Sequence, residues 1–156
     1  MHDGAKDFQN NKEYLYNLLR HTSGQDFPLY ACAKEVVRQY RKPLEPLNLT
    51  YTQYIVMMVL WEFGSMTEGE LGKKVHLNSG TLAPLLKRLE KQGYINRTRP
   101  ENNENRLILS LTDKGDQLRK QAVNVPRMMD GCIPLSSEEI TILKNLLDKA
   151  LMNMSS

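Results

Sequence analysis

The sequence predicts a mainly α-helical fold that includes one small β-hairpin. Leucines at positions 82, 85, 86 and 89 follow the i, i+3, i+4, i+7 spacing of a helix with one buried face. Directly after this helix, residues 96–111 alternate in type as the two strands of a hairpin do. A shorter helix, at residues 66–75, is expected just before the helix that carries the leucines. This order of helix, turn, helix and hairpin is typical of a winged helix-turn-helix.

The N-terminal part of the chain contains one predicted helix. Residues 1–25 are polar and irregular, and we expect them to form an N-terminal extension. Asp26 then supplies an N-cap, and Pro28 lies in the first turn, where its missing N–H costs little. We expect this helix to run to about Leu44, where Pro43 and Pro46 end it.

The central segment carries signals for helix ends. Thr50 or Thr52 is expected to begin a second helix, and Gly64 to end it. Thr67 and Glu70 have the spacing of a capping box, which opens the short third helix. Asn78 or Ser79 caps the fourth helix, and Gly93 follows where a left-handed stop is expected. The outer face of that helix carries Ser79, Thr81, Lys87, Arg88 and Lys91.

Two more helices are predicted after the hairpin. Thr112 caps a helix that Pro126 is expected to kink, and Ser136 with Glu139 forms a capping box that opens a last helix through Met154. The apolar stripes of these helices either pack on the chain's own core or need a second copy. Their distance from the central unit favours a two-fold dimer.

The length of 156 residues suits one domain. We expect that domain at residues 26–156, with the winged helix at about 50–115 and dimerisation helices at about 27–47 and 113–154. No apolar run approaches the roughly 20 residues that span a bilayer, and the N-terminus lacks the apolar core of a secretion signal. The protein is therefore expected to be cytoplasmic, without a membrane partner.

The positive charge is concentrated in one part of the sequence. The whole chain has a net charge of +3, whereas residues 73–114 hold nine Lys or Arg against four acids, a net +5. Any single lysine here is best interpreted as part of a solvated surface. The coincidence with the fourth helix and the hairpin nevertheless indicates neutralisation of nucleic-acid phosphates.

Residues for catalysis or metal binding are scarce. The three histidines, at 2, 21 and 76, do not accompany a recognisable nucleophile motif, and the sequence contains no phosphate-binding loop or metal-spaced His/Cys cluster. We therefore expect neither an enzyme nor a cofactor or metal. The rival to DNA binding is a winged helix that serves as a protein-interaction module, since fold alone does not define function.

From about Asp26 to Met154 the chain resembles the MarR family of bacterial transcription regulators, and within it the organic-hydroperoxide-sensing repressors. The resemblance rests on YACAKEVVRQYRKPLEPLNLTYTQYIVMMVLWE at 30–62, SGTLAPLLKRLEKQGYI at 79–95 and LSLTDKG at 109–115. It implies a homodimeric regulator, most simply a repressor, that places two recognition helices in successive major grooves of pseudo-palindromic DNA, about 34 Å apart.

The resemblance also implies the DNA-binding residues. The matching groove-facing segment contains Ser79, Gly80, Thr81, Pro84, Lys87 and Arg88. At the wing tip the family has an aspartate and an arginine two residues apart, where this chain has Asn103 and Asn105. Arg106 follows one position late, and Arg97 and Arg99 are left for phosphate contacts. We expect a weaker minor-groove contribution and a lower salt dependence than in relatives with charged wings.

The signal to which the protein responds is open between two hypotheses. Relatives sense peroxide with a cysteine held by tyrosines; Tyr30, Tyr40 and Tyr51 match the tyrosines, whereas Asp26 stands at the cysteine position. Cys32 is expected to be a buried apolar residue, but it or Cys132 could instead form a redox switch with the partner subunit. Alternatively, a small aromatic effector binds a pocket, for which the candidate lining residues are Tyr30, Tyr40, Tyr51, Met57, Met58 and Trp61.

Overall fold

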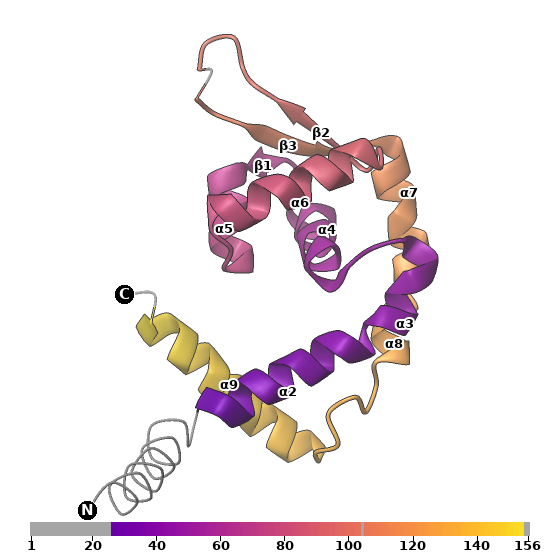
Figure 1. Cartoon of the computed structure of the whole chain (residues 1–156), viewed down its shortest axis with the longest axis vertical. Helices are drawn as coiled ribbons and strands as arrows, with labels where there is room; N and C mark the ends of the chain where they lie inside the picture. Colours follow the sequence, from indigo (N-terminus) through magenta and orange to yellow (C-terminus); the bar gives the residue numbers. More distant parts are fainter. Residues whose placement is uncertain (1–25, 104, 155–156) are drawn as a thin grey trace, which may run out of the picture. The chain divides into compact units, whose positions relative to one another are not determined.

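The computed structural model describes residues 26–103 and 105–154, and the predicted extension at residues 1–25 lies outside them. The chain divides into two compact units, Met1–Gln39 and Tyr40–Ser156. In the first unit the described element is helix α2, Asp26–Gln39. The second unit contains the winged helix, which Figure 1 shows with its hairpin projecting from the helices.

The predicted first helix is shorter than expected. Helix α2 ends at Gln39, and after Tyr40 the chain forms a separate turn of helix, α3 (Arg41–Leu44), and the 3-10 turn η1 (Glu45–Leu47). The prediction of one helix to Leu44 was therefore wrong. Pro43 explains the break, because its ring clashes with the carbonyl group four residues earlier, that of Gln39.

Helix α4 (Tyr51–Phe63) confirms its predicted ends. Thr50 is the N-cap, and it exchanges hydrogen bonds with Gln53 in a complete capping box. Gly64 terminates the helix with a positive φ of 73°. This helix supplies much of the core, since Val56, Met57 and Leu60 are fully buried.

The first two residues of the predicted third helix form a strand instead. Met66 and Thr67 form β1, which pairs antiparallel with Leu109 and Ile108 of β3 (Ile108–Leu111). Helix α5 (Glu68–Val75) follows, and the predicted capping box of Thr67 and Glu70 is confirmed. The prediction that helix begins at Met66 was wrong, because sheet pairing with a distant strand competes successfully with the local signal.

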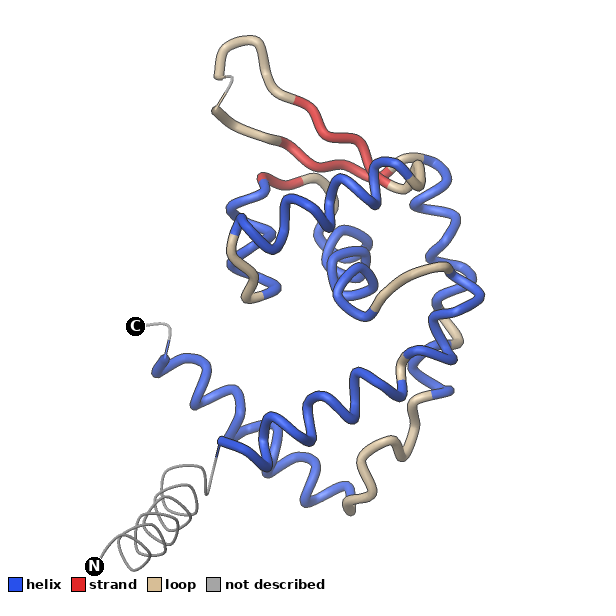
Figure 2. Tube along the Cα trace, in the orientation of Figure 1, coloured by secondary structure: helices blue, strands red, loops and turns tan. Residues whose placement is uncertain are grey.

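The fourth predicted helix and the hairpin are both present. Helix α6 (Ser79–Lys91) is capped by Asn78, and Gly93 has the expected left-handed φ of 79°. Strand β2 (Ile95–Thr98) pairs with β3, so the sheet order is β1-β3-β2. The predicted two-stranded hairpin is thus part of a three-stranded sheet, as Figure 2 shows in red.

The helix expected to bend at Pro126 is divided in two. Helix α7 (Asp113–Ala122) ends before it, and Pro126 lies in the first turn of α8 (Val125–Met128). The last helix, α9 (Ser137–Met154), begins with the predicted capping box, in which the Ser136 backbone N–H donates to Glu139 at 2.8 Å. Within the described part of the chain, no helix is both long and apolar enough to cross a membrane.

One glycine fixes how α7 packs on the sheet. A Cβ atom at Gly115 would overlap the backbone carbonyl of Tyr94, so no other residue fits there. The Gly115 carbonyl in turn accepts a hydrogen bond of 2.9 Å from the Trp61 indole. Gly115 therefore joins α4, α7 and the beginning of the wing.

Candidate nucleic-acid interface

Helix α6 has two sharply different faces. Leu82, Leu85, Leu86 and Leu89 are buried in the core, as the spacing predicted. The six residues that the family resemblance placed in the groove-facing segment all lie on the exposed side of α6: Ser79, Gly80, Thr81, Pro84, Lys87 and Arg88. The structure thus brings the predicted groove-facing residues together on one accessible surface.

The start of α6 is open enough for a close approach by a ligand. Asn78 accepts a hydrogen bond of 2.9 Å from the Thr81 backbone and so satisfies one terminal donor. Pro84 has no N–H, so the Gly80 carbonyl lacks its usual helical donor. The aligned peptide dipoles place partial positive charge at this end of the helix, which favours an anion such as phosphate.

The other end of α6 is fixed to the start of α7. The Lys114 ammonium group donates to the Gln92 carbonyl at 2.7 Å, and the Thr112 hydroxyl donates to the Gly93 carbonyl at 2.6 Å. Lys114 also lies 4.9 Å from the centre of the Tyr94 ring. One cation of the basic segment therefore stabilises the helix end, and the orientation of α6 relative to the sheet is well defined.

The arginines of the wing have different surroundings. Arg97 forms an ion pair with Glu90 at 3.3 Å, its side chain is only 22 % exposed, and its buried Nε has no hydrogen-bond partner within the described residues. Arg99, Asn103, Asn105 and Arg106 are exposed. Arg97 is thus held against α6, and the predicted phosphate contact would have to compete with this ion pair.

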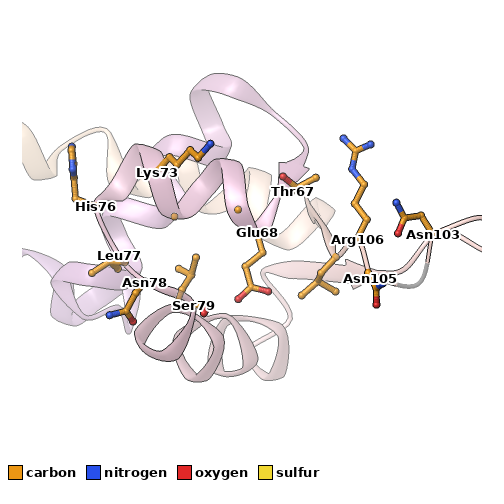
Figure 3. Close-up of a pocket in the computed structure, with 14 residues that line it drawn as sticks. Thr67, Glu68, Lys73, His76, Leu77, Asn78, Ser79, Asn103, Asn105 and Arg106 are labelled. Carbon is orange, nitrogen blue, oxygen red and sulfur yellow. The ribbon is translucent and has the colours of Figure 1, made fainter. Parts of the chain in front are cut away.

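A groove of about 1200 Å³ lies between α5, the start of α6 and the returning arm of the wing. Figure 3 shows Glu68 directed toward the start of α6, whereas Lys73 and Arg106 extend to the other side. Asn103 and Asn105 line the wing side of the groove. Sequence reasoning counted Lys73 only as part of the basic segment and assigned no role to His76; only the folded chain places both beside this groove.

Two of the three predicted sensing tyrosines lie close together. The Tyr40 and Tyr51 ring centres are 4.6 Å apart, and Tyr54 is 6.0 Å from Tyr40. Burial raises the pKa of all three phenols, and the nearby Cys132 contributes to the raised pKa of Tyr40 and Tyr51. The half-buried Cys132 packs against the core. It is therefore a neighbour of these two tyrosines.

The expectations for the remaining sensing residues need correction. Cys32 is exposed, so the interpretation as a buried apolar residue was wrong for the single chain; none of the residues of α2 is buried. Tyr30 is also exposed on this helix. Met57 is fully buried in the core and Trp61 binds the Gly115 carbonyl, so packing accounts for both. Met58 is exposed.

Among the described residues, no group of three or more His, Cys, Asp or Glu side chains is arranged to hold a metal ion.

Comparison with known proteins agrees with this architecture. A family model described as transcriptional regulator SarA/Rot matches residues 39–122. The organic hydroperoxide resistance transcriptional regulator of Bacillus subtilis is 41% identical over 121 residues, which cover 78% of this chain and 82% of that protein. SarZ of Staphylococcus aureus (strain USA300) is 37% identical over 121 residues, covering 77% and 82% of the two proteins.

Two solved structures extend the comparison. The structure of reduced AbfR bound to DNA has a TM-score of 0.73 at 29% identity and covers 90% of this chain and 99% of that chain. A mutant MarR from E. coli complexed with operator DNA has a TM-score of 0.77 at 23% identity, covering 86% and 98%, and supports the fold. The chain belongs to the SarA/Rot family of transcriptional regulators and is a DNA-binding regulator of the MarR type.

Proposed function

We propose that two copies of this chain bind a pseudo-palindromic operator, with α6 of each copy in a major groove. The observation that carries this proposal is the division of α6 into a buried leucine face and an exposed polar and cationic face. An α-helix fits the major groove, where hydroxyl and cationic side chains can reach base edges and phosphates. The protein then acts as a regulator rather than as an enzyme.

The residues of this surface have separable roles in the proposal. Ser79 and Thr81 reach base edges, and Gly80 allows the DNA to approach the backbone. Lys87 and Arg88, up to three turns into the helix, contact phosphate or guanine. On the wing, the exposed Arg99, Asn103, Asn105 and Arg106 contact the neighbouring backbone, while Arg97 chiefly holds the wing through Glu90.

The homodimer is supported by the terminal helices. No residue of α2 or of α9 is buried within the chain, although both helices carry large apolar side chains such as Phe27, Tyr30, Ile142 and Leu146. Covering these surfaces with a second copy would remove apolar area from water. A two-fold dimer would also place one recognition helix at each half-site of a pseudo-palindromic operator.

DNA binding can be tested with a duplex selected by the protein from a random pool. Replacing Lys87 and Arg88 together by Gln is expected to weaken binding and to lower the salt dependence, because up to two cation contacts are lost. The matched control replaces Arg119 and Lys120, an equally exposed basic pair on α7, by Gln. Equal losses for both double variants would argue against the assigned surface.

For the signal, we propose that oxidation of Cys132 modulates DNA binding. Support comes from its position beside Tyr40 and Tyr51, whose hydroxyls can hydrogen-bond an oxidised sulfur. AbfR has been solved in reduced, overoxidized and disulfide forms. A Cys132 thiolate would attack an organic hydroperoxide, giving a sulfenic acid and releasing an alcohol. The exposed Cys32 of a partner subunit could then condense with it, with loss of water.

The redox proposal can be tested with the variants Cys132→Ser and Cys32→Ser. Hydroperoxide treatment should reduce DNA binding of the wild-type protein and leave Cys132→Ser unaffected. Mass spectrometry after thiol labelling would identify the oxidised site. If both serine variants respond as the wild type does, or if aromatic acids but not hydroperoxides release the DNA, the signal is a ligand instead.

A further inference from the structure

The groove beside the wing contains a pair of cations from two different elements. Lys73 belongs to α5, whereas Arg106 belongs to the returning arm of the wing, and both line the groove. Both side chains are exposed, and neither forms an ion pair with another described residue. Figure 3 shows them extending to the same side, opposite to Glu68.

Glu70 lies within electrostatic reach of both cations. Its pKa is lowered, first by hydrogen bonds from the Thr67 backbone and side chain, and further by the charges of Arg106 and Lys73. The Thr67 backbone N–H and hydroxyl each donate to the same Glu70 oxygen at 2.8 Å, so the carboxylate is firmly held. Lys73 and Arg106 thus both act on one fixed acid, while Glu68, the acid that lines the groove, is directed away from them toward the start of α6.

The base of the wing is tied to α5 beside this groove. Strand β1 pairs with β3, and the Glu68 backbone N–H donates to the Leu107 carbonyl at 3.1 Å. Arg106 directly precedes this anchored residue. The separation of Lys73 and Arg106 is therefore controlled by backbone hydrogen bonds at the base of the wing, rather than by the polar tip.

From this arrangement we propose that Lys73 and Arg106 hold one DNA phosphodiester between them at the edge of the groove. The proposal rests on the DNA-binding function proposed above. The wing would then be fastened to the DNA backbone from its base, with the uncharged Asn103 and Asn105 adding no charge at the tip.

The test measures binding to the selected duplex over a salt series for Lys73→Gln, Arg106→Gln and the double variant. Because both cations hold the same phosphate, the double variant should lower the slope of log affinity against log salt by about 0.9. A slope that is unchanged would overturn the proposal. A reduction of about 1.8 would also overturn it, because each cation would then hold its own phosphate.

Glu70→Gln supplies a test of opposite sign. Glutamine can replace glutamate in a capping box, so α5 keeps its cap while the acid beside the phosphate is removed. The complex should become about two- to fivefold tighter, the size expected for one exposed charge interaction. An affinity that does not rise would place the phosphate elsewhere and would overturn the proposal.

The phosphate clamp formed by Lys73 and Arg106 can be disproved separately from the proposed DNA binding. If the wild-type protein selects no duplex, the proposed function and the clamp both fail. If the Lys87 and Arg88 double variant weakens binding but the Lys73 and Arg106 double variant does not, only the clamp fails. Circular dichroism of each variant verifies that the fold is intact.

Discussion

Helices α6 and α9 are both amphipathic, yet only α6 buries its apolar face within the chain. Helix α6 buries four leucines, Leu82, Leu85, Leu86 and Leu89, and exposes its polar residues. Helix α9 buries no residue, and Ile142 and Leu146 remain exposed. The winged unit therefore completes its own core within one chain, whereas the terminal helix presents apolar side chains that this chain does not bury.

The comparison separates stability from assembly. A substitution in the buried face of α6 should reduce the free energy of unfolding at any protein concentration. A substitution in the apolar face of α9 should instead act on association, and through association on DNA binding.

The largest expected effect comes from placing a charge on α9. Leu146→Asp should dissociate the proposed homodimer and weaken operator binding by about 100-fold or more, because two linked half-site contacts become independent. Sedimentation and DNA titration measure the two effects. Asn145→Asp adds the same charge at the neighbouring exposed position and should leave both properties nearly unchanged. A dimer that survives Leu146→Asp would contradict the role assigned to α9.

Truncating the buried face of α6 should have a large effect on stability. Leu86→Ala leaves a cavity in a fully buried position and should lower the free energy of unfolding by about 2–5 kcal/mol. Denaturant titration measures the loss. Lys87→Ala, on the exposed face, should change stability by less than about 0.5 kcal/mol while weakening DNA binding. Similar losses of stability in both variants would undo the two-face interpretation of α6.

Replacing Gly80 by alanine should moderately stabilise the fold and weaken DNA binding. A Cβ atom there would meet only Asn78 Oδ1, at 3.5 Å, so Gly80→Ala is sterically allowed. Alanine in the helix should stabilise the fold by about 0.5–1 kcal/mol. The same methyl group should weaken DNA binding if the DNA backbone or bases approach this residue. Unchanged DNA affinity would mean that Gly80 lies outside the interface.

Gly69→Ala is the matched control for Gly80→Ala. Gly69 is the second residue of α5, as Gly80 is of α6, and a Cβ atom there would meet nothing within 4 Å. We expect a similar gain in the free energy of unfolding and no change in DNA binding. Thermal denaturation and the duplex titration used above measure the two properties.

The smallest effect concerns the cap of α5 and its dependence on pH. The pKa of Glu70 in the folded protein is lowered from 4.5. Its ionised form therefore stabilises the fold above pH 4.5, and this contribution is lost as pH falls through the lower folded-state value. Melting temperatures of the wild type and Glu70→Gln should converge in acid and differ near neutrality. A constant difference over this range would mean that the carboxylate charge is not responsible.

Local sequence signals were sufficient to predict much of the fold and the exposed face of α6. The caps at Thr50, Thr67 and Asn78 and the leucine spacing of α6 involve residues within one or two helical turns of each other. Interactions over such short separations can be recognised in the sequence because the helix geometry itself sets the spacing. The exposed residues of α6 followed from the same geometry.

What the sequence determined by itself was therefore the helix-turn-helix and hairpin, the caps of their helices and the two faces of α6. Only the tertiary structure decided that Met66 and Thr67 pair with β3, that Arg97 binds Glu90, and that Lys73 faces the wing. It also decided that Cys132, and not Cys32, lies against the core. These outcomes depend on contacts between distant segments, which have no fixed spacing in the sequence and arise only when the chain has folded.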